Sequence, residues 1–451
     1  MANVVIVGGG ITGLAAAWEL QQQGVAYTLL EGSGRLGGKI TTESVDGFVI
    51  EGAADSFLTT RNLSAWQLCR EIGLGDRLIG TNPEKRAVYV FSKGHLHPFP
   101  RGMRLIVPLD AEGLMESPLL SEQGKRRMLD EINIPAVSAA TDESLASFIR
   151  RRFGEEALEI FGDSLLSGIH AADPEKLSVA AAYPDYPRLE RTYGSVIRGT
   201  QSSPAPAPNP DGPRSMFMSP RRGMGEMIDT LVGCLTGDVR VGQSVTQIDD
   251  RTVLTESGER ITAAAIILTT SARVAATAVK RSLPQLADSL SAFTCISSGN
   301  VSLGFRLEDI PRPLDGTGFV IPRSEGTRIG ACTWSSIKFA GRAPDGFALL
   351  RVFVGGFGRE DDINLPDDEL IKLALTALRN IMGIQAAPVI QRVFRWRDAS
   401  PQYAVGHLER LEALRSMCPA WLVLAGSPYG GIGIPDCVGQ GRLAAQQVSQ
   451  I

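Results

Sequence analysis

The sequence predicts an α/β fold, with an α+β part, that opens on a nucleotide-binding βαβ unit and is assembled from discontinuous segments. A short apolar run at 3–7 leads through a glycine turn into a helical pattern at 14–23 and a second apolar run at 25–31. Another strand, glycine turn and helix recur at the end of the chain, over 421–448. We therefore expect the two ends to share one domain, into which the intervening segments are inserted.

The middle of the chain predicts further strands and helices. Residues 80–100 alternate like a hairpin that turns at Lys93-Gly94, and much of 101–170 has a helical pattern. Strands are expected at 216–220, 239–241, 245–248 and 264–270, a hairpin turn at 256–259, a strand-rich stretch at 295–355, and helices at 62–73, 225–235, 366–382 and 436–448. The segment 201–213 carries five prolines and predicts an exposed, poorly ordered loop.

The composition excludes several classes of partner. The chain has 451 residues and a net charge of −4, so it has no basic surplus that would attract nucleic acid. The first residues lack the basic start and long apolar core of a signal peptide, and no apolar run reaches the ~18–20 residues of a membrane-spanning helix. We therefore expect contact with a membrane to be peripheral at most.

The cysteines and histidines show no metal pattern. Six cysteines are scattered without paired spacing, which is typical of a protein in the reducing cytoplasm and excludes ordinary zinc and redox motifs. His95 and His97 alternate on one face of the expected hairpin, but no cysteine or carboxylate pattern accompanies them. No metal site is predicted.

The first chemical motif is the glycine turn after the first strand. Gly8, Gly10 and Gly13 have the G-x-G-x-x-G spacing, which permits a tight turn and brings a pyrophosphate against a helix N-terminus. Glu31 follows the next strand, 21 residues after Gly10, where a carboxylate accepts hydrogen bonds from an adenosine ribose. The spacing of glycines and acid together predicts a dinucleotide site.

The next segment selects the dinucleotide. Arg35-Leu-Gly-Gly-Lys39 places two glycines between two cations, a second phosphate contact that is familiar from flavin proteins. FAD is therefore favoured over NAD. No second G-x-G-x-x-G stands between a strand and a helix, so a nicotinamide site is not expected, and oxidase or desaturase chemistry follows.

The C-terminal glycine turn supports the same cofactor. Gly430 to Pro435 leads into a helix, with Pro435 or Asp436 suited to its first positions. A helix N-terminus aimed at the flavin N1/O2 edge stabilises the reduced flavin anion by about 0.3 to 1 kcal/mol. No cysteine or histidine lies within the turn from Gly426 to Pro435, so we expect the FAD to be bound non-covalently.

Over nearly its whole length the sequence resembles the FAD-linked amine oxidase superfamily and, within it, the porphyrinogen oxidases of the Gram-positive type. Two motifs are shared across the superfamily, GGGITGL at 8–14 and the Arg35–Lys39 element. GAADSF at 52–57 is a further carrier, and the closer resemblance to porphyrinogen oxidases is carried by LLSGIHAADPEKLS at 165–178, WRDASPQYAVGH at 396–407 and GIGIPDC at 431–437.

The resemblance implies a three-part chain and a set of FAD contacts. The FAD-binding domain would comprise 1–56, 216–285 and 410–451, the strand-rich substrate domain 57–80, 171–215 and 286–409, and the helical, membrane-binding-like domain 81–170. The residues expected at FAD are Gly8, Gly9, Gly10, Ile11, Thr12, Gly13, Leu14, Glu31, Gly32, Arg35, Gly38, Lys39, Gly52, Ala53, Ala54, Asp55, Val245 through its backbone, Trp396, Ile432, Gly433 and Ile434.

The resemblance also implies the reaction. A porphyrinogen has bridging methylenes whose hydride is transferable because the pyrroles stabilise the resulting cation, so flavin N5 can accept it without a strong catalytic base. Molecular oxygen would then reoxidise the flavin and yield peroxide. Arg61 is the candidate cation for the carboxylates of the tetrapyrrole, and Ile169 the candidate apolar wall. No catalytic acid or base is assigned.

Two other readings stay open at this stage. The chain could be another superfamily enzyme, an amine oxidase or a carotenoid desaturase, or a flavin-free binding module of the same fold. The tail Ser427-Pro-Tyr-Gly-Gly lacks the cysteine that often holds FAD in amine oxidases, and the intact glycines disfavour a loss of flavin. The sequence does not choose between coproporphyrinogen III and protoporphyrinogen IX, or between a monomer and a homodimer.

Overall fold

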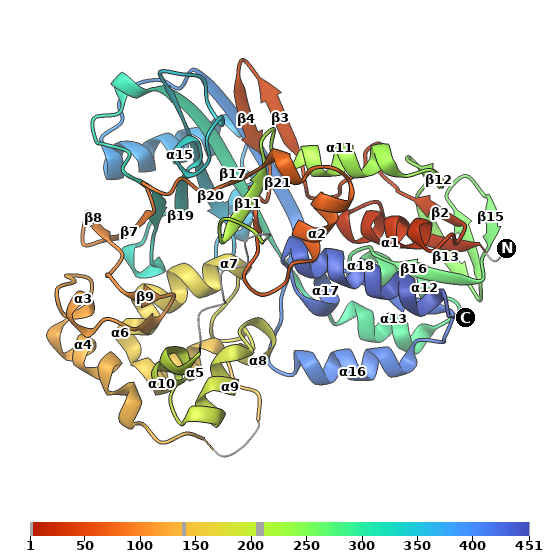
Figure 1. The fold of residues 1–451 in the computed structure, drawn as a ribbon, viewed down its shortest axis with the longest axis horizontal. Coiled ribbons are helices and arrows are strands. Elements are labelled where there is room, and N and C mark those ends of the chain that lie inside the picture. Colours follow the sequence, from red (N-terminus) through yellow and green to blue (C-terminus); the bar gives the residue numbers. More distant parts are fainter. Residues whose placement is uncertain (1–2, 138–140, 204–211, 451) are drawn as a thin grey trace. The chain divides into compact units, whose positions relative to one another are not determined.

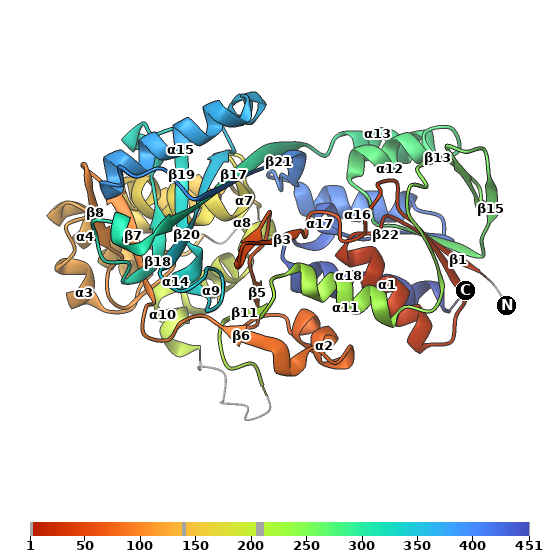
Figure 2. The same cartoon turned by 90° about the horizontal axis from the view of Figure 1, so that it is seen from above.

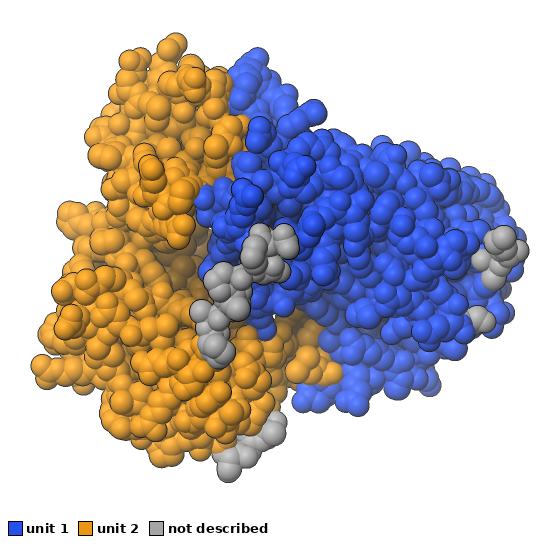
Figure 3. Space-filling view, viewed as in Figure 1, with its two compact units in different colours: residues 1–81, 213–294, 409–451 blue, residues 82–212, 295–408 orange. Residues whose placement is uncertain are grey.

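The structure, a computed structural model, describes residues 3–137, 141–203 and 212–450 (Figure 1). Residues 204–211 of the proline-rich segment therefore lie outside the described part. The chain divides into two compact units (Figure 3): unit 1 comprises residues 1–81, 213–294 and 409–451, and unit 2 comprises residues 82–212 and 295–408.

The centre of unit 1 is a parallel sheet of five strands. Its order is β12 (Asp238–Arg240), β2 (Tyr27–Leu30), β1 (Val4–Val7), β16 (Ala265–Leu268) and β22 (Leu422–Leu424). Strands from the beginning, middle and end of the chain are thus neighbours. The predicted discontinuous nucleotide-binding fold is confirmed.

Helices cover both faces of this sheet, which explains why its central strands are continuously apolar. Val4 and Ile6 of β1 face one core, whereas Val5 and Val7 face the other. Figure 2 shows α1, α11 and α18 on one side and α12 and α13 on the other. The helices of unit 1 are α1 (Ile11–Gln22), α2 (Ser64–Glu71), α11 (Gly225–Cys234), α12 (Ala272–Val279), α13 (Pro284–Ser291), α16 (His407–Met417, mostly in this unit), α17 (Ser427–Gly430) and α18 (Ile434–Val448).

Three small antiparallel sheets complete unit 1. They are β3 (Thr42–Val45) with β4 (Phe48–Glu51); β5 (Phe57–Leu58), β11 (Phe217–Pro220) and β6 (Leu78–Gly80) in the order β5-β11-β6; and β13 (Val245–Asp249), β14 (Thr252–Thr255) and β15 (Arg260–Thr262). The second sheet ties residues 57–80 to the segment that begins near 217.

Unit 2 is built on a seven-stranded sheet. Its order is β21 (Ile390–Pro401), β17 (Cys295–Arg306), β20 (Phe347–Gly355), β19 (Ile329–Trp334), β18 (Gly316–Val320), β7 (Ala87–Ser92) and β8 (His95–Pro98). The pairs are antiparallel except β18 with β7. Helix α15 (Asp367–Met382) packs its apolar side against this sheet, where Leu370, Ala374 and Leu378 are buried.

The remainder of unit 2 is mainly helical. It comprises the short hairpin β9 (Met103–Arg104) and β10 (Val107–Pro108), and the helices α3 (Ala111–Met115), α4 (Glu122–Leu129), α5 (Leu145–Phe153), α6 (Glu155–Ala157), α7 (Gly168–His170), α8 (Val179–Ala182), α9 (Asp185–Tyr193), α10 (Val196–Ser202) and α14 (Ser335–Lys338). A π-helix, Leu158–Ser167, joins α6 to α7. π-Helical turns are rare and often mark functional sites.

Several predicted elements have corrected bounds. Helix α1 begins at Ile11, three residues earlier than predicted, and α18 begins at Ile434, two residues before the predicted Asp436. The last helix starts early because Gly433 has the extended backbone of an N-cap, which leaves Pro435 in the first turn. The predicted hairpin at 80–100 is confirmed, and Lys93 and Gly94 at its turn have φ values of 52° and 79°.

The three-part division of the chain stays a prediction. All three segments assigned to the FAD-binding domain fall within unit 1, as do residues 57–80, which were assigned to the substrate domain. The segment 81–170, assigned to the helical domain, supplies β7 and β8 to the seven-stranded sheet, so it is not helical throughout.

Helices α1 and α18 meet backbone to backbone, which generates a stability prediction. A Cβ on Gly441 would lie 2.2 Å from the carbonyl oxygen of Thr12. Gly441→Ala should therefore lower the free energy of unfolding by about 1 to 3 kcal/mol, because one of the helices must move.

The matched control is Gly233→Ala in α11, where a Cβ would meet nothing within 4 Å. That change should raise the free energy of unfolding by about 0.5 to 1 kcal/mol through helix propensity. Chemical denaturation of both variants checks the pair, and a Gly441→Ala protein as stable as wild type would contradict the packing argument.

Candidate cofactor site

The glycine turn after β1 brings the first turn of α1 against the end of the strand. The N–H of Gly8 donates to the carbonyl oxygen of Leu30 at 2.8 Å, which places the turn beside the end of β2. A Cβ on Gly13 would lie 1.9 Å from the carbonyl oxygen of Gly8. Only glycine permits this approach, which fixes where the N-terminus of α1 points.

The second glycine element lies directly on the first. The N–H of Gly37 donates to the carbonyl oxygen of Gly9 at 2.8 Å, and a Cβ on Gly38 would lie 3.1 Å from the Cα of Gly10. The guanidinium of Arg35 donates to the carbonyl oxygens of Gly38 at 2.5 Å and Ile40 at 3.1 Å. Arg35 thus stabilises this loop through hydrogen bonds to its backbone, whereas Lys39, which follows Gly38, is exposed.

Glu31 lies at the end of β2, between the two loops. One carboxylate oxygen, Oε2, accepts from the N–H of Gly9 at 2.7 Å, and the other, Oε1, accepts from the N–H of Ser33 at 2.8 Å. Because a carboxylate can accept about four hydrogen bonds, capacity is left for a hydroxyl donor. Glu31 is therefore fixed in place and still suited to a ribose.

A second segment runs beside Glu31 and brings Val245 to the same edge. The N–H of Glu31 donates to the carbonyl oxygen of Arg240 at 2.9 Å, and the N–H of Gln243 donates to the carbonyl oxygen of Glu31 at 2.8 Å. Val245 follows as the first residue of β13 and is half-buried. A Cβ on Gly32 would lie 3.1 Å from the hydroxyl of Ser244, so Gly32 lies close to this segment too.

Among the described residues of unit 1, the N-termini of two helices of twelve or more residues have glycine N-caps without a side-chain cap. They belong to α1, capped at Gly10, and α18, capped at Gly433. The first N–H groups of a helix need acceptors, and a phosphate or an anionic ring edge supplies them. Ile11 to Leu14 and Ile432 to Ile434, all predicted FAD contacts, stand at or beside these two ends.

The predicted contacts at 52–55 follow strand β4. The N–H of Gly52 donates to the carbonyl oxygen of Thr41 at 2.9 Å, and the hydroxyl of Ser56 donates to Asp55 at 2.7 Å. The preceding Glu51 is buried, and its carboxylate accepts from the N–H of Met224, the N-cap of α11, at 2.7 Å. The segment with Ala53 and Ala54 is thus anchored at both ends within unit 1.

The C-terminal turn contributes residues that the sequence argument passed over. Asn62 donates to the carboxylate of Asp436 at 3.1 Å, and Gln440 accepts from the N–H of Gly426 at 3.1 Å. Cys437 is buried against Thr12, and burial raises the pKa of its thiol to about 11. This thiol therefore stays protonated near neutral pH. Cys437 is the fourth residue of α18, and its place in the first turn of the expected C-terminal helix was the available signal.

The geometry fits a flavin dinucleotide. Unit 1 contains two loops in which glycines permit close approach to the backbone. It also contains the fixed carboxylate of Glu31 and two helix N-termini with glycine caps. The remaining predicted site residues lie elsewhere: Arg61 is exposed just before α2 in unit 1, whereas Trp396 on β21 and Ile169 in α7 belong to unit 2. As a set, the site residues stay a prediction.

The two unit 2 candidates differ in exposure. Trp396 pairs across the sheet with Ser298 and is half-buried. Ile169 follows the π-helix directly and is 59% exposed, among the largest values of the apolar side chains described. Ile169 is therefore not part of the apolar core, and its side chain is available to an apolar ligand.

His170, next to Ile169, is enclosed by aromatic rings. Its ring centroid lies 5.6 Å from that of Tyr183 and 5.9 Å from that of Tyr403. Within the described residues the Nδ1 atom of His170 has no hydrogen-bond partner. Burial lowers the pKa of His170 to about 4, so it is neutral at physiological pH and holds the segment after the π-helix by packing.

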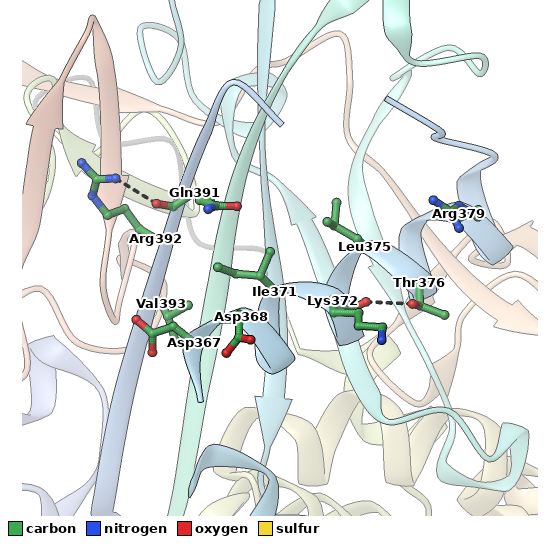
Figure 4. A pocket seen from close by; sticks show the side chains of 10 residues that line it. All are labelled: Asp367, Asp368, Ile371, Lys372, Leu375, Thr376, Arg379, Gln391, Arg392 and Val393. Atoms are coloured by element: carbon green, nitrogen blue, oxygen red, sulfur yellow. Dashed lines mark hydrogen bonds between the residues drawn. The ribbon is translucent and has the colours of Figure 1, made fainter. Parts of the chain in front are cut away.

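A surface groove of unit 2 has no link to the predicted site residues. Figure 4 shows the side chains that line it, which come from α15 and the edge strand β21. The volume of the groove is about 800 Å³. Its lining mixes apolar residues such as Ile371 and Leu375 with acids and bases such as Asp368 and Lys372. No predicted FAD or substrate residue lines it, so we assign it no part in the chemistry.

The residues that the structure describes contain neither a metal-binding cluster nor a membrane-spanning helix. No group of three or more metal-ligating side chains occurs in the part of the chain that the structure describes. Across the same residues, no helix combines the length and the apolar character needed to cross a membrane.

Comparisons with known proteins define the class. The sequence profile of the family "Flavin containing amine oxidoreductase" matches residues 11–449. The chain is 34% identical to the coproporphyrinogen III oxidase of Bacillus subtilis (strain 168), over 98% of this chain and 97% of that protein. It is 32% identical to the coproporphyrinogen III oxidase of Propionibacterium freudenreichii, over 99% and 90%.

Among solved structures, a candidate protoporphyrinogen oxidase from Exiguobacterium sp. 255-15 superposes with a TM-score of 0.86 at 30% identity, over 100% of this chain and 99% of that one. The chain belongs to the flavin-containing amine oxidoreductase family. It is therefore an FAD-dependent oxidoreductase, and the predictions of the cofactor and of the fold are confirmed.

The carboxylate of Glu31 generates a prediction about cofactor affinity. Glu31→Gln removes a charged acceptor from the N–H groups of Gly9 and Ser33 and from the ribose. The dissociation constant for FAD should rise about tenfold or more. Titration of the flavin-depleted protein with FAD, followed by flavin fluorescence, measures it.

Asp229→Asn, on the exposed face of α11, makes the same change of charge in the same unit and serves as the control. It should leave FAD affinity within about twofold, since within the described residues the Asp229 carboxylate makes no hydrogen bond or ion pair with either glycine loop. An unchanged affinity in Glu31→Gln would contradict the role given to this carboxylate.

His170 generates a prediction about pH. Its folded-state pKa of about 4 lies below the 6.5 of the unfolded chain, so between these values the unfolded chain binds more protons. The stability that the neutral His170 side chain contributes is fully present above pH 6.5 and is lost as the pH falls. At pH 5 the free energy of unfolding should be lower by about 2 kcal/mol for this reason. His170→Phe should weaken the fall in unfolding free energy between pH 7 and pH 5 by about that amount.

Denaturant unfolding at the two pH values provides the measurement. His95→Phe, at an exposed position on β8, is the matched control and should keep the wild-type pH dependence. Parallel pH dependence in the wild type and in His170→Phe would show that His170 is not the titrating group.

Proposed function

We propose that this chain oxidises a porphyrinogen to a porphyrin in haem biosynthesis, with coproporphyrinogen III as the favoured substrate and protoporphyrinogen IX as the alternative. The observation that carries the proposal is the near full-length similarity, at 34% and 32% identity, to two coproporphyrinogen III oxidases. It extends over both units, so it covers the part of the chain beyond the cofactor site. The reading as an amine oxidase or a carotenoid desaturase is the second candidate.

The cofactor residues of unit 1 support oxidation by flavin. When bound there, FAD would supply an acceptor for hydride at N5, from which molecular oxygen would take up the electrons as peroxide. The residues that would hold it are the two glycine loops, Glu31 at the ribose, Val245 at the adenine, and the N-termini of α1 and α18. The N-terminus of α18 would face the ring edge where negative charge develops on reduction, which favours electron uptake.

The substrate side needs little proton chemistry from the protein. A methylene between pyrroles loses hydride readily because the rings stabilise the cation that remains, so positioning and exclusion of water carry most of the catalysis. The exposed Ile169 is suited to an apolar macrocycle, and the exposed Arg61 to one of its carboxylates. Trp396 would contribute from β21.

Several finer features belong to the same proposal. Molecular oxygen is the proposed acceptor, and the protein acts as a monomer or a homodimer with peripheral membrane contact at most. A location in the cytoplasm is favoured by the six cysteines, all of which are free thiols. Non-covalent FAD is favoured by the burial of Cys437, whose raised pKa makes the thiol unreactive.

The test is turnover by the purified flavoprotein. Each freshly reduced porphyrinogen is supplied in air, and porphyrin fluorescence and peroxide are recorded together. We expect higher kcat/KM for coproporphyrinogen III than for protoporphyrinogen IX, with peroxide released. Acid precipitation should release the flavin into solution, as expected for non-covalent binding.

Polyamines and a carotenoid precursor serve as alternative substrates in the same assay. Reduction of the flavin by one of these, and by neither porphyrinogen, would overturn the proposal in favour of the second candidate. Faster oxidation of protoporphyrinogen IX would keep the reaction class and reverse the order of the two substrates.

A further inference from the structure

Beside Ile169, unit 2 holds two cations around one aromatic ring. The segment that follows Ile169 is fixed to the loop after β20, because the N–H of Phe357 donates to the carbonyl oxygen of Ala171 at 3.1 Å. The guanidinium carbon of Arg323 lies 4.8 Å from the ring centroid of Phe357, and the ammonium of Lys176 lies 6.0 Å from it. Two positively charged side chains thus lie beside the half-buried ring of Phe357, near the segment that follows the exposed Ile169.

Arg323 is held in one orientation by the π-helix. Its Nε lies 2.7 Å from one carboxylate oxygen of Asp163, and its backbone N–H donates to the other at 2.8 Å. Within the residues that the structure describes, the two terminal NH₂ groups of Arg323 make no further hydrogen bond or ion pair. Its side chain is 35% exposed, so these donors can be reached by a ligand.

The arrangement suits a carboxylate. The outer edge of a guanidinium binds a carboxylate through two parallel hydrogen bonds, and an arginine fixed through its Nε loses little freedom when it does so. Burial lowers the pKa of the neighbouring Arg359 and the charge of Arg323 lowers it further, whereas the carboxylates of Asp163 and Asp362 raise it. Lys176 is 75% exposed and supplies a more mobile cation, 3.7 Å from Asp173.

We propose that Arg323, positioned by Asp163, and Lys176 bind propionate carboxylates of the tetrapyrrole while Ile169 and Phe357 contact its apolar face. This inference rests on the proposed function and adds specificity to it. Coproporphyrinogen III carries a propionate on every pyrrole, whereas protoporphyrinogen IX has vinyl groups in place of some of them. Cations here, in addition to Arg61, therefore favour the substrate with more carboxylates.

The first experiment compares Arg323→Met with the wild type, both loaded with FAD. KM for coproporphyrinogen III should rise about tenfold or more, since a charge-assisted hydrogen-bond pair is lost, and kcat should stay within about twofold. Arg306→Met is the matched control, because Arg306 is another arginine over a phenylalanine ring of unit 2: its guanidinium carbon lies 5.5 Å from the ring centroid of Phe347, and the residue is exposed. It should leave KM within about twofold.

A binding measurement gives a readout that does not depend on turnover. Coproporphyrin III and its tetramethyl ester are titrated, in dilute detergent, into the flavin-loaded proteins, and porphyrin fluorescence reports binding. The wild type should bind the free acid about tenfold or more tightly than the ester. In Arg323→Met the ratio of the affinities for the free acid and the ester should be about tenfold smaller, because the guanidinium that recognises the carboxylate is absent.

Lys176→Met keeps the inference testable if Arg323→Met does not fold, because a side chain that is 75% exposed contributes little to stability. KM for coproporphyrinogen III should rise about threefold in this variant. Active wild type with unchanged KM in every folded variant would overturn the inference alone. Wild type that oxidises neither porphyrinogen would overturn the proposed function itself.

Discussion

The cofactor half of this protein depends on close backbone approach at positions that have no side chain. Helix α1 can start where it does because a Cβ on Gly13 would lie 1.9 Å from the carbonyl oxygen of Gly8. Helix α18 can cross α1 because Gly441 lies against Thr12. These approaches determine where both helix N-termini lie, and the ends carry glycine caps that leave their first N–H groups to a ligand. The charge of a bound dinucleotide is thus met by main-chain donors, in a chain whose net charge is −4.

Local patterns predicted the unit 1 fold and its cofactor because the determinants are close in sequence. All the determinants of this prediction lie within about thirty residues: the apolar run of β1, the glycine spacing after it, and Glu31. Each is required at its position for a steric or hydrogen-bonding reason. The start of α18 was placed two residues late, since Pro435 and Asp436 are good first-turn residues and the cap at Gly433 is recognisable only from its backbone.

Other features could not be predicted because they depend on distant partners or on irregular geometry. Asp163 and Arg323 contact each other although they are 160 positions apart in the sequence, and neither lies within one of the motifs described above. The π-helix before Ile169 has no periodicity that a 3.6-residue pattern would detect. The donation of Arg35 to carbonyl groups of its own loop was not predicted, because composition does not show this use, and its predicted contact with FAD stays a prediction.

The strand order of unit 1 has a consequence for how the protein is made. Strand β1 emerges first from the ribosome, but its neighbour β16 comes from the middle of the chain, and β22 and α18 come from its last segment. Contacts that span almost the whole sequence form slowly, since a long loop must close before they contribute. The flavin site is therefore completed only after residues 422–448 have been synthesised, and until then the apolar faces of β1 and α1 lack the partners that bury them in the folded unit.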